Sequence, residues 1–305
     1  MFRRLPPLVA LLLLGLLVTA CGGIGSTDGK PQVVTSFYPL QFVTERIVGN
    51  HAHVTNLTSP GAEPHDLQLT VRQGVLVSNA ELAVYEHGLQ PSVDQVVTND
   101  PPRHAVDVAD VVRLSAVPPG LGDEHATDAK GNAVDPHFWL DPTLLGRVAD
   151  RIAAVMARAD PKHAADYRAN NAALQSDLRS LDHDYRVGLE HCRSRTLVVS
   201  HDAWEYLGRR YHLRIYPIAG ISPDAEPSPK HLSELSQLIR TDKITTVFTE
   251  RLASPKLADA LAGDLGIRTA VLDPIEGLSS ADPQATYLSL MRENLAAIQK
   301  ADSCS

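Results

Sequence analysis

The sequence is poor in cysteine and has no long run of one charge. Three cysteines among 305 residues are too few for a disulfide scaffold, and none forms the Cys-x-x-Cys pair of common zinc sites. His-Glu-x-x-His, Gly-x-Ser-x-Gly and glycine-rich phosphate loops are missing, which removes the usual signatures of metalloproteases, serine hydrolases and nucleotide enzymes. The net charge is −8 and basic residues do not cluster, so we expect no nucleic-acid partner.

What is present indicates an ordinary globular chain with 44% hydrophobic and 21% charged residues. Short β-rich runs alternate with stretches of helical periodicity in both halves, which predicts an α/β fold with parallel sheets flanked by helices. The length suits two domains or one large domain. The clearest strand candidates are Gln32–Ser36, His53–Thr58, Thr196–Ser200, Thr245–Glu250 and Thr269–Asp273.

The N-terminus has the features of an export signal. Two arginines precede an apolar run, Leu8–Val18, which at 11 residues is shorter than the roughly 20 that a membrane-spanning helix needs. We therefore predict a signal peptide over residues 1–20. Val18-Thr19-Ala20-Cys21 resembles a bacterial lipobox, so Cys21 is predicted to carry lipid, followed by a glycine-rich tether over 21–31. This places the protein outside the cytoplasm, anchored to the cell membrane.

Two cysteines remain once Cys21 is assigned to lipid. Because an exported protein meets an oxidising environment, we predict a Cys192–Cys304 disulfide, with two separate buried thiols as the alternative. The bridge would close a loop of about 110 residues and, from chain entropy, would contribute roughly 4–5 kcal/mol.

The best-marked helix begins at Asp141-Pro142. Asp141 is suited to cap the first turn, proline is tolerated there, and Pro161 stops the helix near residue 160. We interpret 141–160 as the connector between an N-terminal lobe over 32–140 and a C-terminal lobe over 161–305. An ordinary core helix within one lobe is the alternative.

Four candidate ligands lie next to predicted strand ends or at the start of the connector. His65 lies in the loop after the second strand run, His137 precedes the connector, His201 follows a strand, and Asp273 closes one. Ligands in parallel α/β sheets bind at the carboxyl ends of strands. Two candidates fall in each half of the chain, which is the pattern expected for one ion held between two lobes.

The chain carries five longer motifs: Pro64-His65-Asp66, Asp135-Pro136-His137-Phe138-Trp139-Leu140-Asp141-Pro142, Ser200-His201-Asp202-Ala203-Trp204-Glu205-Tyr206-Leu207, Ile218-Ala219-Gly220-Ile221-Ser222-Pro223-Asp224-Ala225-Glu226-Pro227-Ser228-Pro229 and Val271-Leu272-Asp273-Pro274. Together these motifs resemble those of the metal-binding solute-binding proteins of bacterial ABC importers. The resemblance extends from about Val33 to Lys300, and it implies two α/β lobes joined by one long helix, with zinc or manganese between them. It places the metal ligands on His65, His137, His201 and Asp273.

The histidine at the third ligand position favours zinc. The resemblance implies that relatives with a carboxylate there tend towards manganese, whereas three imidazoles and one carboxylate suit Zn(II). Manganese or another divalent metal is the alternative within the same class of binding protein.

Other residues near these motifs have supporting roles. Glu250 is a rival fourth ligand, but we expect it behind the ligands, together with Trp139 and Trp204. His125, beside Asp123 and Glu124, resembles a reduced form of the histidine-rich loop found in some zinc-binding relatives. We treat metal capture by His125 as a hypothesis.

The predicted function is capture of Zn(II) outside the cytoplasm and delivery to the ABC permease of a zinc importer. We expect a monomer held at the membrane by its lipid. Four protein ligands leave no coordination position for water or substrate, so we predict a binding protein rather than an enzyme. A secreted zinc hydrolase and a surface adhesin are the alternatives.

Overall fold

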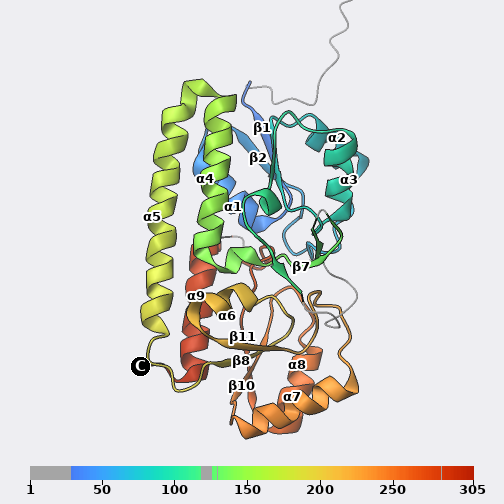
Figure 1. The fold of residues 1–305 in the computed structure, drawn as a ribbon, viewed down its shortest axis with the longest axis vertical. Helices are drawn as coiled ribbons and strands as arrows, with labels where there is room; N and C mark the ends of the chain where they lie inside the picture. Colours follow the sequence, from blue (N-terminus) through green and yellow to red (C-terminus); the bar gives the residue numbers. More distant parts are fainter. Residues whose placement is uncertain (1–28, 118–125, 129, 283) are drawn as a thin grey trace, which may run out of the picture.

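The computed structural model describes residues 29–117, 126–128, 130–282 and 284–305. Two α/β lobes follow one another along the long axis of the molecule (Figure 1). The signal segment, Cys21 and His125 lie outside the described residues. Among the helices that are described, none has the length and apolar character needed to cross a membrane.

The strands are β1 Gln32–Thr35, β2 His53–Asn56, β3 Leu82–Tyr85, β4 Ala105–Asp107, β5 Ser115–Ala116, β6 Ala126–Thr127, β7 Ala133–Asp135, β8 Thr196–Val199, β9 Arg214–Pro217, β10 Thr246–Thr249 and β11 Arg268–Val271. The α-helices are α1 Tyr38–Val48, α2 Val71–Ser78, α3 Pro91–Asn99, α4 Pro142–Ala159, α5 Ala164–Gly188, α6 Glu205–Tyr211, α7 Pro229–Thr241, α8 Lys256–Leu265 and α9 Tyr287–Asp302. Three 3₁₀ turns complete the set: η1 Val108–Asp110, η2 Phe138–Leu140 and η3 Pro161–His163.

Each lobe is built on a parallel four-stranded sheet. The N-terminal sheet has the order β2-β1-β3-β4 and the C-terminal sheet the order β11-β10-β8-β9. A small antiparallel sheet, β5-β7-β6, was not anticipated from the sequence; its central strand β7 leads directly to His137. The predicted α/β class and the five predicted strand runs are confirmed as β1, β2, β8, β10 and β11.

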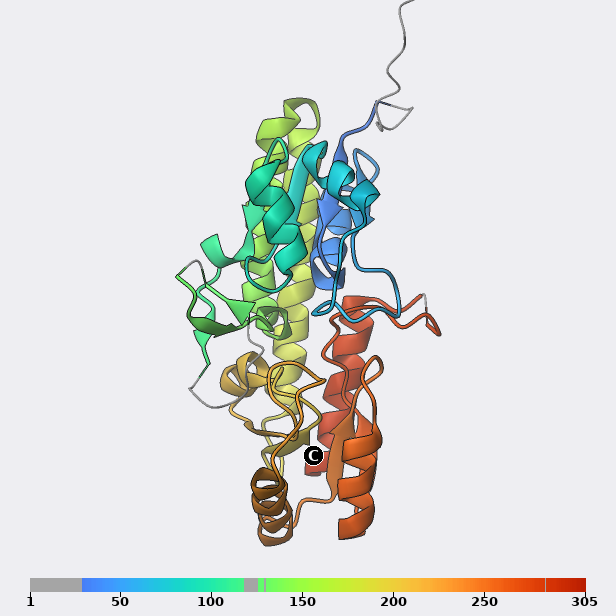
Figure 2. The same cartoon turned by 90° about the vertical axis from the view of Figure 1, so that its right-hand side faces the viewer.

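The connection between the lobes differs from the expectation. The helix predicted over 141–160 is α4, and Asp141 caps it by accepting a hydrogen bond from the Thr143 amide at 2.8 Å. After α4 the chain turns through η3, which begins at Pro161, and returns as α5. Because α5 packs against α1 and α4 in one lobe and against α9 in the other, α5 rather than α4 connects the lobes (Figure 2).

One apolar core continues through both lobes. Its buried members include Val33 and Ile47 from the N-terminal lobe, and Leu197 and Ile298 from the C-terminal lobe. Burial of this shared surface holds the lobes together through the hydrophobic effect. Tyr185 on α5 strengthens the contact, since its buried hydroxyl donates to the Met291 carbonyl at 2.6 Å.

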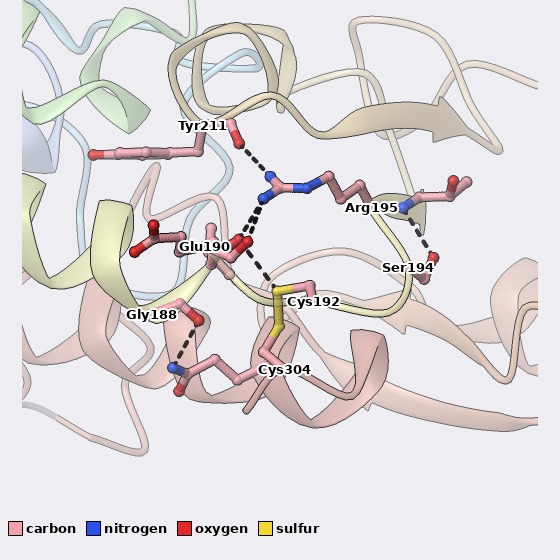
Figure 3. Close-up of a disulfide and its surroundings, with 10 residues drawn as sticks. Gly188, Glu190, Cys192, Ser194, Arg195, Tyr211 and Cys304 are labelled. Atoms are coloured by element: carbon pink, nitrogen blue, oxygen red, sulfur yellow. Dashed lines mark hydrogen bonds between the residues drawn. A yellow bond between two sulfur atoms is a disulfide. The ribbon is translucent and has the colours of Figure 1, made fainter.

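The predicted Cys192–Cys304 disulfide is formed and joins residues 112 positions apart (Figure 3). Beside it, the Arg195 guanidinium donates to the carbonyls of Leu189 at 2.7 Å and Glu190 at 3.0 Å. The bridge fastens the residues after α9 to the segment that leads into β8, and the Arg195 bonds hold that segment against the end of α5.

Candidate metal centre

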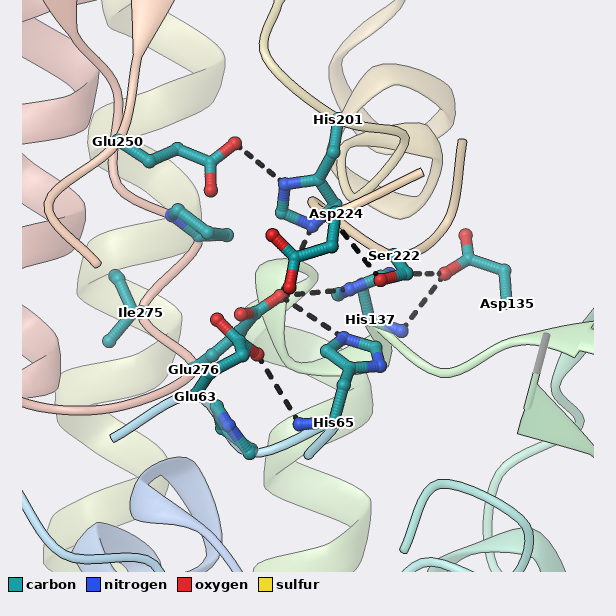
Figure 4. A network of polar contacts seen from close by, with 12 residues as sticks. Glu63, His65, Asp135, His137, His201, Ser222, Asp224, Glu250, Ile275 and Glu276 are labelled. Atoms are coloured by element: carbon teal, nitrogen blue, oxygen red, sulfur yellow. Dashed lines mark hydrogen bonds and ion pairs between the residues drawn. The ribbon is translucent and has the colours of Figure 1, made fainter. Parts of the chain in front are cut away.

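Three imidazoles surround one carboxylate oxygen between the lobes (Figure 4). Glu276 Oε1 lies 3.0 Å from His137 Nε2, 3.2 Å from His201 Nε2 and 3.6 Å from His65 Nε2. The donor atoms of His65, His137 and Glu276 all lie within 4.8 Å of one another, close enough to share one ion.

Both lobes contribute to this cluster. His65 lies in the loop after β2 and His137 two residues after β7, whereas His201 comes two residues after β8 and Glu276 five residues after β11. His137 and His201 are fully buried and Glu276 is 2% exposed. His65 is the most accessible of the three imidazoles, with 12% of its side chain exposed, so it lies on the solvent side of the cluster.

Two further carboxylates orient the buried imidazoles. Asp135 Oδ1 lies 2.8 Å from His137 Nδ1, and Glu250 Oε1 lies 2.6 Å from His201 Nδ1. A carboxylate that accepts the Nδ1 proton leaves the Nε2 lone pair free for a metal. Glu250, the rival fourth ligand of the sequence analysis, therefore lies behind His201, and Ser200 Oγ also donates to it.

Neighbouring side chains in the cluster shift one another's pKa values. Burial acts to lower the pKa of His137, but its hydrogen bonds to Asp135 and Glu276 outweigh that effect and raise the pKa to about 9. The pKa of His201 is also raised well above its ordinary value, since Glu250 and Glu276 overcome the effect of burial. Burial works to raise the pKa of Glu276, yet contacts with the histidines hold it well below its usual range.

A second carboxyl group, Glu63, lies beside Glu276 (Figure 4). Burial and the nearby Glu276 charge raise the pKa of Glu63 to about 8. Glu63 Oε1 also accepts a hydrogen bond from the His65 amide at 3.3 Å, which ties it to the loop that carries this imidazole.

The structure does not place Asp273 among the imidazoles, in contrast to the sequence expectation. Asp273 Oδ2 lies 3.0 Å from Arg251 Nε, and Oδ1 accepts a hydrogen bond from the Ile275 amide at 2.9 Å. Its carboxylate is thus occupied by an arginine and by the backbone. The carboxylate beside the histidines belongs to Glu276, which the sequence analysis missed although it lies three residues after Asp273.

Of the two tryptophans, Trp139 contacts this cluster. The Trp139 ring meets the His137 ring edge-on, with centroids 5.3 Å apart, and Trp139 Nε1 donates to the Pro274 carbonyl at 2.7 Å. Trp204 is fully buried three residues after His201. Trp139 thus lies directly against one imidazole of the cluster.

Comparison with known proteins identifies the family. A family model described as "ZnuA: Zinc-uptake complex component A periplasmic" matches residues 33–301. The chain belongs to the ZnuA family. The resemblance to metal-binding solute-binding proteins is thereby confirmed.

Named relatives are similar over nearly the whole chain. The chain is 32% identical over 316 residues to the high-affinity zinc uptake system protein ZnuA of Bacillus subtilis. It is 30% identical over 295 residues to the zinc-binding lipoprotein AdcA of Streptococcus pneumoniae. The first comparison covers 98% of each protein. The second covers 94% of this chain and 59% of AdcA, so the chain spans a little over half of that relative.

A solved structure shares the fold. The Zn(II)-bound ZnuA-like domain of Streptococcus pneumoniae AdcA matches with a TM-score of 0.74 and 29% identity, over 90% of this chain and 99% of that domain.

Proposed function

We propose that this ZnuA-family protein binds Zn(II) through His65, His137, His201 and Glu276 during zinc uptake. The observation that carries the proposal is the convergence of three imidazole nitrogens on one buried carboxylate oxygen. Zinc favours nitrogen-rich sets of four donors, whereas manganese prefers oxygen ligands. The names of the relatives, which include a zinc uptake protein and a zinc-binding lipoprotein, support the same metal.

The donor set favours binding over catalysis. Four protein donors fill a tetrahedral zinc shell, whereas a catalytic zinc keeps one position for water or substrate. Zn(II) is therefore the cargo of this protein. Asp135 and Glu250 act on the imidazoles, which they hold with Nε2 directed at the ion.

Delivery to the permease of an ABC importer follows from membership of a zinc-uptake family. We infer that the protein works outside the cytoplasm, that Cys21 carries a lipid anchor, and that the protein is a monomer. The description of one relative as a zinc-binding lipoprotein supports the anchor.

Closure around zinc is proposed to be small. The lobes share one apolar core and are joined by a 25-residue helix, so a large hinge motion would have to expose buried surface. Solution scattering that showed strong compaction on zinc addition would contradict this part of the proposal.

The test is metal analysis of protein purified without chelator, followed by competition between zinc and manganese on the parent and on His201→Asp. We expect one zinc per chain in the parent and a strong loss of zinc preference in the variant. His183→Asp, the same change at an exposed histidine, is the matched control and should behave as the parent does. An unchanged metal preference in His201→Asp would contradict the proposed ligand set.

A further inference from the structure

The turn between β11 and Glu276 contains a strained residue. Ile275 is fully buried and has φ of +60°, one of four positive values among the described non-glycine residues. A β-branched side chain is disfavoured in this region because Cβ crowds the backbone. Such a conformation persists where surrounding contacts hold it, and it occurs often at functional sites.

The side chain of Asp273 supplies one of these contacts. Its Oδ1 accepts the Ile275 amide proton at 2.9 Å and so closes the turn from the inside. Its Oδ2 is held 3.0 Å from Arg251 Nε, and Arg251 in turn reaches Glu293 on α9 at 2.6 Å. The carboxylate that closes the turn is thus itself fixed in place.

The backbone of the turn is held from both lobes. On α9, Asn294 Oδ1 accepts from the Asp273 amide at 2.8 Å, and Asn294 Nδ2 donates to the Asp273 carbonyl at 2.6 Å. From the N-terminal lobe, Trp139 Nε1 donates to the Pro274 carbonyl at 2.7 Å. These bonds leave the turn little freedom before Glu276.

The strained residue directly precedes the carboxylate that meets the imidazoles. Rotation of Ile275 to an ordinary negative φ would change the direction of the chain at Glu276 and move Oε1 away from His137 and His201. We propose that Asp273 is a positioning residue for the metal, which holds Ile275 in the left-handed conformation so that the Glu276 carboxylate reaches the ion. This inference rests on the proposed zinc function and assigns Asp273 a role other than ligand.

Two substitutions at Asp273 separate positioning from ligation. Asp273→Ala removes the acceptor for the Ile275 amide, and we expect zinc affinity to fall about 10–100-fold, the usual effect of losing a residue that orients a ligand. Asp273→Asn keeps an oxygen in that place and should retain most of the affinity. Equal, large losses in both variants would show that Asp273 is itself a ligand and would overturn the inference, as would an unchanged affinity in Asp273→Ala.

A double-variant cycle tests whether Asp273 acts through Glu276. Glu276→Gln alone should weaken zinc binding, and adding Asp273→Ala to it should cause no further loss. Losses that multiply would overturn the inference. Visible absorption of the Co(II)-substituted protein gives a readout of coordination: Asp273→Ala should reproduce the spectrum of Glu276→Gln, whereas Asp273→Asn should keep that of the parent.

Controls separate this inference from general instability and from the proposed function. Asp177→Ala removes another arginine-paired carboxylate, 2.6 Å from Arg46, and should leave zinc affinity unchanged. If Asp273→Ala does not fold, Asp273→Asn carries the test, because a loss of affinity as large as that of Glu276→Gln in this variant would again overturn the inference. Loss of binding in Glu276→Gln without loss in Asp273→Ala refutes the positioning role alone, whereas a parent protein that binds no zinc refutes the proposed function.

Discussion

The two edges of the C-terminal lobe are stabilised in different ways. The cleft edge, which we define by His201, Glu250 and Glu276, collects buried ionisable groups. Contacts between them raise the pKa of His201 and lower that of Glu276. The disulfide edge, defined by Cys192, Arg195 and Cys304, is closed by a covalent bond and by an arginine whose donors meet backbone carbonyls. The disulfide edge is complete without a ligand, whereas the cleft edge is built around groups that a divalent cation would neutralise.

Loss of the disulfide should therefore affect stability and leave binding intact. Cys192→Ser/Cys304→Ser is expected to lower the free energy of unfolding by roughly 4–5 kcal/mol, since the bridge restricts a loop of 112 residues in the unfolded chain. Denaturant unfolding measures this change, and zinc titration should give the parent dissociation constant. A matching fall in zinc affinity would mean that the two edges are not independent.

Zinc should stabilise the protein through its four ligands, independently of the disulfide edge. At a free zinc concentration a thousandfold above the dissociation constant, the expected stabilisation is about 4 kcal/mol. Thermal unfolding with and without chelator should show the same zinc-dependent gain in the parent and in the disulfide-free variant. A gain that disappeared with the disulfide would contradict the comparison.

Substitution of a single ligand should lower zinc affinity, whereas loss of the disulfide should lower stability. His137→Ala is expected to weaken zinc binding by about 100-fold or more, because the imidazole is one of four donors. The metal-free variant also loses the charged contacts of His137 with Asp135 and Glu276, so its melting temperature must be recorded beside the zinc titration. Affinity equal to that of the parent would remove His137 from the ligand set.

A change of one pH unit has the smallest of these effects and acts on the imidazoles of the candidate metal site. Because the pKa of His137 is raised to about 9, the protonated imidazole stabilises the metal-free fold below about pH 6.5, and this contribution is lost as the pH rises through 9. Zinc needs the neutral imidazole, so its affinity should rise over the same interval, by about tenfold per pH unit for each proton released.

Calorimetry in buffers of different ionisation enthalpy should detect at least one proton released per zinc near neutral pH. The disulfide-free variant should release the same number. Absence of proton release would contradict the pKa assigned to His137.

Most of the fold was predictable because local patterns determine it. Alternating β-rich and helical runs marked five strands, shared between the two four-stranded sheets, and Asp141 and Pro161 marked the ends of α4. The choice of connecting helix was not predictable, since α4 carries clear start and stop signals while the reach of α5 depends on which helices it packs against. Tertiary packing, rather than any residue in α5 itself, decides that role.

The carboxylate that lies beside the three histidines was not predictable from the sequence either. Asp273 and Glu276 lie three residues apart after one strand, and either could serve as an oxygen donor from sequence alone. The choice depends on the position of Arg251, which pairs with Asp273, and on the left-handed conformation of Ile275, which turns the chain before Glu276. Neither feature has a local sequence signal, whereas the three histidines could be placed because they lie in motifs that resemble those of the metal-binding family.

A crystal structure of the zinc-loaded protein, with anomalous scattering recorded at the zinc edge, tests the metal site most directly. We expect one ion bound by Nε2 of His65, His137 and His201 at Zn–N distances of ~2.0–2.1 Å and by the Glu276 carboxylate. Asp273 should remain paired with Arg251. An ion bound by Asp273, or a zinc peak away from the three imidazoles, would contradict this assignment.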